Sequence, residues 1–231
     1  NSIFSRWSND EYNPGILIEE NVFKIDIKNY SDKKLDDSFL WAVVKGFDGR
    51  ITALSLGPIE SKKWTTNSVE LKNIKYPARL IGIEVYEPSS EDNSKPFKLN
   101  LNSINFIDSS NNLIRNISFN ESLNWTELPT SEGFDTTIEY NPEGLILNLG
   151  NGSTKGIRGM FLSNYDEGIP VIVNQEFINN SEINIGEKFI FNASGSYIPM
   201  KIEKKINYFS GTSEKYDSFL LADLRLLKNY M

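Results

Sequence analysis

Four side chains of this sequence are candidates for binding a sugar ring or another flat, polar ligand. Trp64 and Trp125 stand in polar surroundings, and exposed aromatic faces are the surfaces on which sugar rings stack. Arg79 and Tyr86 belong to one predicted strand and could line a concave sheet face. A simpler interpretation stays open, in which the tryptophans close the ends of a sandwich and the strand carries an ordinary solvated face.

Two groups of carboxylates suggest other chemistry. Asp36 and Asp37 lie in a predicted loop, where acidic side chains could hold a structural calcium ion, although no EF-hand spacing is present. Glu84 and Glu87 could act as the acid and base of a glycosidase, which needs two carboxyl groups at a set separation. The chain has 31 acidic residues, so solvated surface positions and coincidence explain both groups equally well.

Two residue types are absent from the sequence, and their absence excludes several kinds of chemistry. The sequence contains no cysteine and no histidine. Disulfides, thiol catalysis, Ser-His-Asp catalysis and the usual zinc sites are therefore excluded. We expect no catalytic residue and, apart from the calcium ion, no cofactor.

Composition and charge indicate a folded protein that does not bind nucleic acid. Of the 231 residues, 39% are hydrophobic and 12% aromatic, enough for a substantial core. The net charge of −7 opposes binding to phosphate backbones and to anionic membranes. The sequence has no apolar run of the ~18–20 residues that a membrane span needs and no signal peptide at Asn1. Both ends are expected to continue in a longer protein.

Short apolar and alternating segments predict that the first 150 residues form a jelly-roll β-sandwich. Turn residues separate these segments, and no long helical pattern lies between them. The predicted strands are Val22–Ile27, Ser38–Val44, Ile51–Leu56, Val69–Ile74, Arg79–Tyr86, Phe97–Ile107, Leu113–Phe119, Thr136–Tyr140 and Gly144–Leu149.

A glycine-rich stretch, Gly150–Gly156, predicts a boundary between domains at residues 1–150 and 151–231. The second part reads as a small α+β domain. Its predicted order is an apolar strand (Pro170–Val173), a helix capped by Asn174, a β-hairpin, a final strand, and a helix capped by Asp223. The fold class is therefore mainly β, with a sandwich followed by an α+β domain.

The order of elements from Ile157 to Met231 resembles the extracytoplasmic domain of FtsX-like (MacB-type) ABC-transporter permeases. Glu187 and Ser210 depart from the pattern, which usually has aspartate and proline there. The segments Gly49–Pro58 and Pro77–Val85, with Trp64 between them, resemble the jelly-roll insert, similar to galactose-binding modules, of some large permeases of this family. The residues that fall at the expected places of the C-terminal pattern are Pro170, Phe177, Gly186, Phe209, Asp223 and Leu224.

The resemblance implies a non-catalytic domain on the extracellular or periplasmic side of a membrane. Its partners would be the transmembrane helices and cytoplasmic ATPase of the full protein, with a glycan or an extracellular protein as the ligand outside. Two alternatives remain open: a stand-alone carbohydrate-binding module, and a glycoside-active enzyme that uses two carboxylates.

Overall fold

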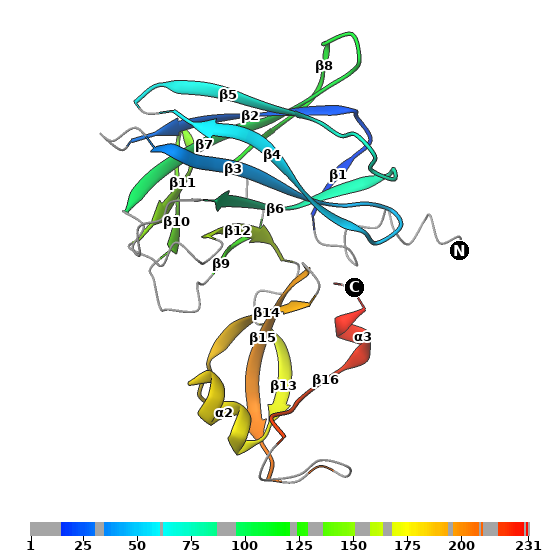
Figure 1. Ribbon diagram of the computed structural model, residues 1–231, viewed down its shortest axis with the longest axis vertical. Helices are drawn as coiled ribbons and strands as arrows, with labels where there is room; N and C mark the ends of the chain where they lie inside the picture. The colour runs from blue at the N-terminus through cyan, green and yellow to red at the C-terminus, as the bar shows by residue number, and fades with distance from the viewer. Residues whose placement is uncertain are drawn as a thin grey trace. The chain divides into compact units, whose positions relative to one another are not determined.

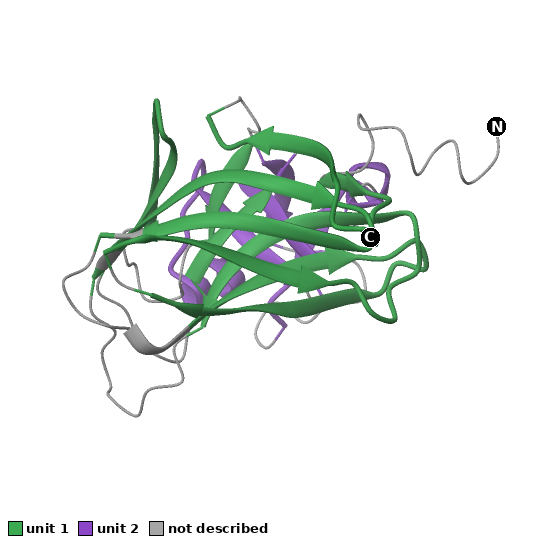
Figure 2. Cartoon of the chain, turned by 90° about the horizontal axis from the view of Figure 1, so that it is seen from above, with its two compact units in different colours: residues 1–10, 15–162 green, residues 11–14, 163–231 purple. Residues whose placement is uncertain are grey.

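The computed structural model is mainly β, as predicted, and the chain divides into two compact units (Figures 1 and 2). Unit 1 comprises residues 1–10 and 15–162, and unit 2 residues 11–14 and 163–231. At residues 29, 35–38 and 97 the structure describes the backbone alone. The described residues are 15–30, 35–60, 62–86, 96–120, 124–128, 136–150, 158–163, 168–193, 196–207, 209, 217–228 and 230.

Unit 1 is built from two antiparallel sheets in a sandwich-like arrangement. The first sheet has the order β4 (Ile51–Ile59), β3 (Leu35–Lys45), β6 (Ala78–Tyr86), β12 (Arg158–Leu162) and β9 (Trp125–Leu128), with β1 (Ile16–Ile18) also paired to β6. The second has the order β10 (Thr136–Asn141), β11 (Gly144–Leu149), β7 (Phe97–Ile107), β2 (Val22–Asn29) and β5 (Trp64–Glu70), with β8 (Leu113–Ser118) paired to β7. Successive strands repeatedly change sheet, as in jelly-roll winding.

Alternation along the strands builds the core of unit 1. In β2, Phe23, Ile25 and Ile27 are buried in the core, and the polar residues between them take the opposite face of the sheet. The neighbouring strand β7 buries its apolar side chains in the same core: Leu99, Leu101, Ile104 and Phe106. The alternation shifts by one residue between Leu101 and Ile104, because β7 has a β-bulge there. Each fully buried side chain of this size contributes about 1.5–3 kcal/mol.

The strands of unit 1 agree with the predicted positions except at weak signals. The predicted strand Val69–Ile74 is wrong in its bounds, because the strand in this region, β5, covers Trp64–Glu70. This strand lies at the edge of its sheet and is mostly polar, so it gives little apolar signal. The strands β1, β9 and β12 were not predicted, since runs of 3, 4 and 5 residues are too short to show a period.

The predicted domain boundary after residue 150 must move by one strand. Arg158–Leu162 forms β12, which pairs with both β6 and β9, and Met160 and Leu162 belong to the core of unit 1. The chain therefore divides between Leu162 and Ser163.

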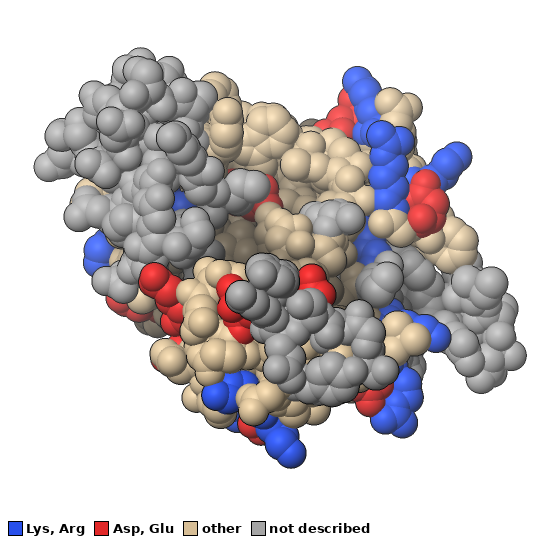
Figure 3. Space-filling view, turned by 60° about the horizontal axis from the view of Figure 1, so that its bottom comes forward, with Lys and Arg blue, Asp and Glu red and all other residues tan. Residues whose placement is uncertain are grey.

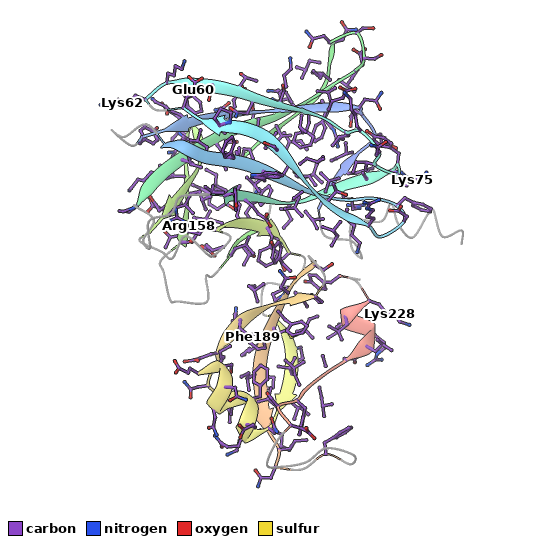
Figure 4. The ribbon with its side chains drawn as sticks, viewed as in Figure 1. Glu60, Lys62, Lys75, Arg158, Phe189 and Lys228 are labelled. Atoms are coloured by element: carbon purple, nitrogen blue, oxygen red, sulfur yellow. The ribbon has the colours of Figure 1, made fainter. Side chains whose placement is uncertain are left out.

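Unit 2 has its own four-stranded sheet and its own core. The sheet order is β14 (Lys188–Ala193), β15 (Ser196–Lys205), β13 (Ile169–Val173) and β16 (Leu220–Ala222), and β13 runs parallel to β15. The ring of Phe177, on the helix α2 (Gln175–Ser181), packs against that of Phe189 with 5.7 Å between the ring centroids. Phe189, labelled in Figure 4, belongs to β14. The buried core consists of Ile169, Val171, Val173, Ile198, Met200, Ile202 and Tyr230.

Asn174 caps helix α2, as predicted, and also holds the chain before β16. Its Oδ1 accepts hydrogen bonds from the N–H of Phe177 at 3.0 Å and of Phe219 at 3.2 Å. Its Nδ2 donates to the carbonyl of Asp217 at 2.6 Å. One side chain, 2% exposed, thus connects segments more than 40 residues apart in sequence.

Asp223 is the N-cap of helix α3 (Leu224–Leu227), also as predicted. The hydrogen bond from the Arg225 side chain, aided by the Arg225 backbone N–H, lowers the pKa of its carboxyl from 3.8 to about 2. This interaction stabilises the folded chain fully above pH 3.8 and is lost as the pH falls toward 2.

We expect an NMR titration of the Asp223 carboxyl to give a midpoint near 2 in the folded chain. In Arg225→Gln the midpoint should rise, because the charged hydrogen-bond donor is removed. A midpoint near 3.8 in the unmodified chain would contradict the observed contact.

Charged side chains of both signs lie on the face drawn in Figure 3, with acidic and basic residues interspersed over the described part. Among the described residues, the structure has no helix with the length and apolar character needed to traverse a bilayer.

Candidate ligand-binding site

An open pocket of about 550 Å³ lies on unit 1, beside the solvent-facing side of the second sheet. Trp64 and Thr66 come from β5, Asp26 from β2 and Asn102 from β7. The turn between β10 and β11 supplies Pro142 and Glu143. Strand alternation places these polar side chains outside, because their apolar neighbours fill the core. The volume falls within the range of about 300–1,000 Å³ that is typical of small-molecule sites.

Asp26 is the centre of a hydrogen-bond network that crosses neighbouring strands. Its carboxylate accepts from the hydroxyl of Thr66, from the hydroxyl of Ser103 at 3.3 Å, and from Nδ2 of Asn105 at 3.2 Å. Asn105 Oδ1 in turn accepts from Nδ2 of Asn116 on β8 at 2.6 Å. Several donors on one carboxylate fix its position without a cation.

A β-bulge places Asn102 against the turn that closes the pocket. Asp26 pairs with Ser103, but Ile27 pairs with Leu101, so Asn102 is the extra residue on β7. Bulges re-aim side chains and often occur beside binding sites. The Nδ2 of Asn102 donates to the carbonyl of Glu143 at 2.8 Å, which ties the β10–β11 turn to β7.

Trp64 provides the aromatic surface of the pocket. It is 42% exposed and lies opposite Lys28 across the β2–β5 pair. The ammonium of Lys28 lies 5.7 Å from the Trp64 ring centroid and 5.0 Å from that of Tyr30. These cation–π contacts hold the indole without closing it off from solvent.

The structure does not bring the four predicted ligand residues together. Trp64 lines the pocket. Trp125 is 7% exposed and packs in the core, 5.6 Å from Phe119, so its polar sequence surroundings were misleading. Tyr86 is exposed but lies on the other sheet, in edge contact with Trp41 at 6.4 Å.

Arg79 is not a surface residue, contrary to the sequence interpretation. It is 1% exposed, and its Nη1 donates to the carbonyl of Gly15 at 2.7 Å. The guanidinium thus holds the segment that leads into β1 against β6, which is a structural role.

The structure bears differently on the predicted calcium site at Asp36 and Asp37 and on the predicted acid–base pair of Glu84 and Glu87. Asp36 and Asp37 do not lie in a loop, since their backbone belongs to β3, at an irregularity between Leu35 and Phe39. Their side chains lie outside the described part of the structure. Glu84 is 8% exposed in β6, and Glu87 is outside the described residues. Within the described residues, no three acidic side chains gather as a metal site would require.

Among the described residues of unit 1, the titratable groups with shifted pKa values lie outside the pocket lining; besides Asp108, whose pKa is lowered by hydrogen bonds from Asn112, they are Lys45, Tyr76 and Tyr140. Burial lowers the pKa of Lys45 and raises that of Tyr76, to which the charge of Glu20 adds. Burial also raises the pKa of Tyr140, with a further contribution from Glu127. These shifts follow from packing at other places in the sandwich.

Sequence reasoning missed Asp26, Thr66, Asn102 and Glu143. The alternation Lys24, Asp26, Lys28 was visible, but it predicts only a solvated face. The bulge at Asn102 and the pairing of β5 with β2 depend on long-range contacts, and no local pattern indicates them.

Comparisons of the chain with protein-family models, with curated proteins and with solved structures found no match.

Proposed function

We propose that this chain is a non-catalytic extracytoplasmic region of an FtsX-like (MacB-type) ABC-transporter permease. The observation that carries the proposal is unit 2, which has its own core and the element order strand, helix, hairpin, strand and capped helix. A tail folded into the sandwich as additional strands would have argued against it. Within the described part of the segment from Ile157 to Met231, β12 pairs with strands of the sandwich, and the element order begins after it, at β13.

Five of the six residues on which the resemblance rests lie in or beside the ordered elements of unit 2, which supports the proposal. Pro170 lies in β13, at a residue whose side chain is exposed. Phe177 joins the helix to the sheet, and Gly186 forms the turn before β14 with a φ of +90°. Asp223 caps the closing helix, and Leu224 is its first residue.

The two units would divide the work. Unit 1 would engage a substrate or partner outside the membrane through its sheet surfaces, and unit 2 would connect this head to the transmembrane helices. ATP hydrolysis by the cytoplasmic subunit would then move the head. The proposal requires no catalytic residue and no cofactor.

A labelling experiment on the full-length protein tests this location. The segment contains no cysteine, so Lys72→Cys, at a side chain that is 73% exposed, introduces its one accessible thiol, once any cysteines elsewhere in the full-length protein have been replaced by serine. We expect a membrane-impermeant maleimide to label it in intact cells. Val173→Cys, at a residue that is 0% exposed, is the matched control and should react only after denaturation.

Two results would contradict the proposal. One is labelling of Lys72→Cys only after the cells are lysed. The other is a full-length gene that lacks apolar spans of roughly 20 residues beside this segment.

A stand-alone carbohydrate-binding module is the second candidate function. The observation that favours it is the exposed indole of Trp64 beside a row of hydrogen-bonding side chains. A stand-alone module would be encoded by a gene without membrane spans, whereas a permease gene would encode them. The sequence of the full-length gene therefore decides between the two candidates.

A further inference from the structure

We infer that the pocket of Trp64 and Asp26 binds an uncharged oligosaccharide. The inference rests on the proposed function, because it names what the recognition surface of unit 1 would engage. It is argued from the aromatic surface, the hydrogen-bonding groups and the charge of this pocket.

The indole of Trp64 is prepared for stacking. It is exposed, it lines the pocket, and Lys28 restrains it from the neighbouring strand. A restrained aromatic ring loses little conformational entropy on binding. Sugar rings present apolar C–H faces, which suit a flat aromatic surface.

The polar groups beside the indole match sugar hydroxyls. The hydroxyl of Thr66 donates to Asp26, which leaves its oxygen able to accept. Asn102 uses one amide hydrogen on the Glu143 carbonyl, so a second N–H and the Oδ1 remain for a ligand. Hydroxyl groups both donate and accept, so they pair with this mixture better than a purely accepting anion does.

The charge of the lining selects against acidic ligands. Among the described residues that line the pocket, the ionisable ones are Asp26 and Glu143, and both are acidic. Lys28 contacts the Trp64 ring but does not line the pocket. A phosphate, a uronic acid or an acidic peptide would meet like charge, which disfavours binding. An uncharged sugar avoids this cost and can still donate hydroxyl hydrogens to the carboxylates.

Titration calorimetry on the complete 231-residue chain tests the inference. The neutral probes are cellohexaose, xylohexaose, mannohexaose, maltohexaose and N-acetylated chitohexaose, and the acidic probe is hexagalacturonate. We expect at least one neutral hexamer to bind, and the acidic one to bind more weakly. In Trp64→Ala, affinity for the bound hexamer should fall about tenfold or more, as expected when a principal contact is removed.

Two further variants make the test specific. Tyr86→Ala removes an aromatic ring of similar exposure (49%) from the other sheet and should change the affinity by less than about twofold. Thr66→Val keeps the shape of the side chain but removes its hydroxyl, and should weaken binding about three- to tenfold. Thermal unfolding of each variant confirms that the fold is retained.

The inference is overturned if none of the neutral hexamers binds at millimolar concentration. It is also overturned if hexagalacturonate binds most tightly, or if Trp64→Ala and Tyr86→Ala have equal effects. These results are separate from the test of location. Absence of sugar binding together with labelling of Lys72→Cys from outside would leave the permease proposal standing and remove only this inference.

Discussion

Replacing Gly144 with alanine is expected to destabilise unit 1 by about 3 kcal/mol or more. Gly144 has a φ of +133°, a backbone angle that residues with a Cβ atom rarely adopt. A Cβ at this position would lie 2.1 Å from the carbonyl oxygen of Leu101 and 2.9 Å from the Cα of Asn102. Both atoms belong to the backbone of β7, so no side-chain rotation can relieve the clash.

The same substitution should also damage the pocket. The β10–β11 turn carries Pro142 and Glu143, and it is held to β7 by the hydrogen bond from Asn102. Displacement of the turn would break this bond and open one wall. Thermal unfolding should show a loss of roughly 6–12 °C in the Tm of unit 1.

Gly57→Ala is the matched control in the same unit. Gly57 has a φ of +104°, but a Cβ there would have only an ordinary contact, 3.5 Å from Nδ2 of Asn67. This variant therefore carries the backbone strain without the clash and should lose about 1 kcal/mol. Equal losses in the two variants would show that the close approach of the turn to β7 is not a constraint.

Replacing Asn174 with alanine is expected to destabilise unit 2 by about 2–4 kcal/mol. An ordinary N-cap contributes only one hydrogen bond at an exposed helix end, whereas Asn174 makes three and is 2% exposed. Without it, the N–H groups of Phe177 and Phe219 and the carbonyl of Asp217 would lose their described partner. The loss should open both the start of α2 and the segment before β16.

Native-state hydrogen exchange measures this effect where it occurs. The amides of β13 and α2 should exchange faster in Asn174→Ala, by the amount that corresponds to the lost stability. Asp223→Ala is the matched control, since it removes the other N-cap of the same unit, at a side chain that is 36% exposed. A loss in Asn174→Ala no larger than that in the control would contradict the bridging role.

The predicted caps and strands succeeded where the information is local. Asn174 and Asp223 were identified because a short polar side chain before an apolar run is itself the physical cause of a helix start. Alternating apolar residues likewise place Phe23, Ile25 and Ile27 in a core whatever sheet they join. The strand β5 is mostly polar and has no such alternation of apolar residues, so its position was missed.

Two of the predicted ligand residues were misplaced because their burial depends on long-range contacts. Trp125 and Arg79 looked solvated because their neighbours in sequence are polar or alternate in pattern, yet both are buried. Burial depends on the tertiary packing around a residue, and both lie on strands that pair with segments distant in sequence.

The residue pattern alone predicts a mainly β protein with a following α+β unit, and the chain contains no residues for thiol, histidine or typical zinc chemistry. The division after Leu162 became visible only in the folded chain, as did the pocket formed by Asp26, Trp64, Thr66, Asn102 and the β10–β11 turn. Element type follows from local preference and hydrophobic period, whereas a site on a sheet face depends on strand order, register and a bulge, which long-range pairing sets.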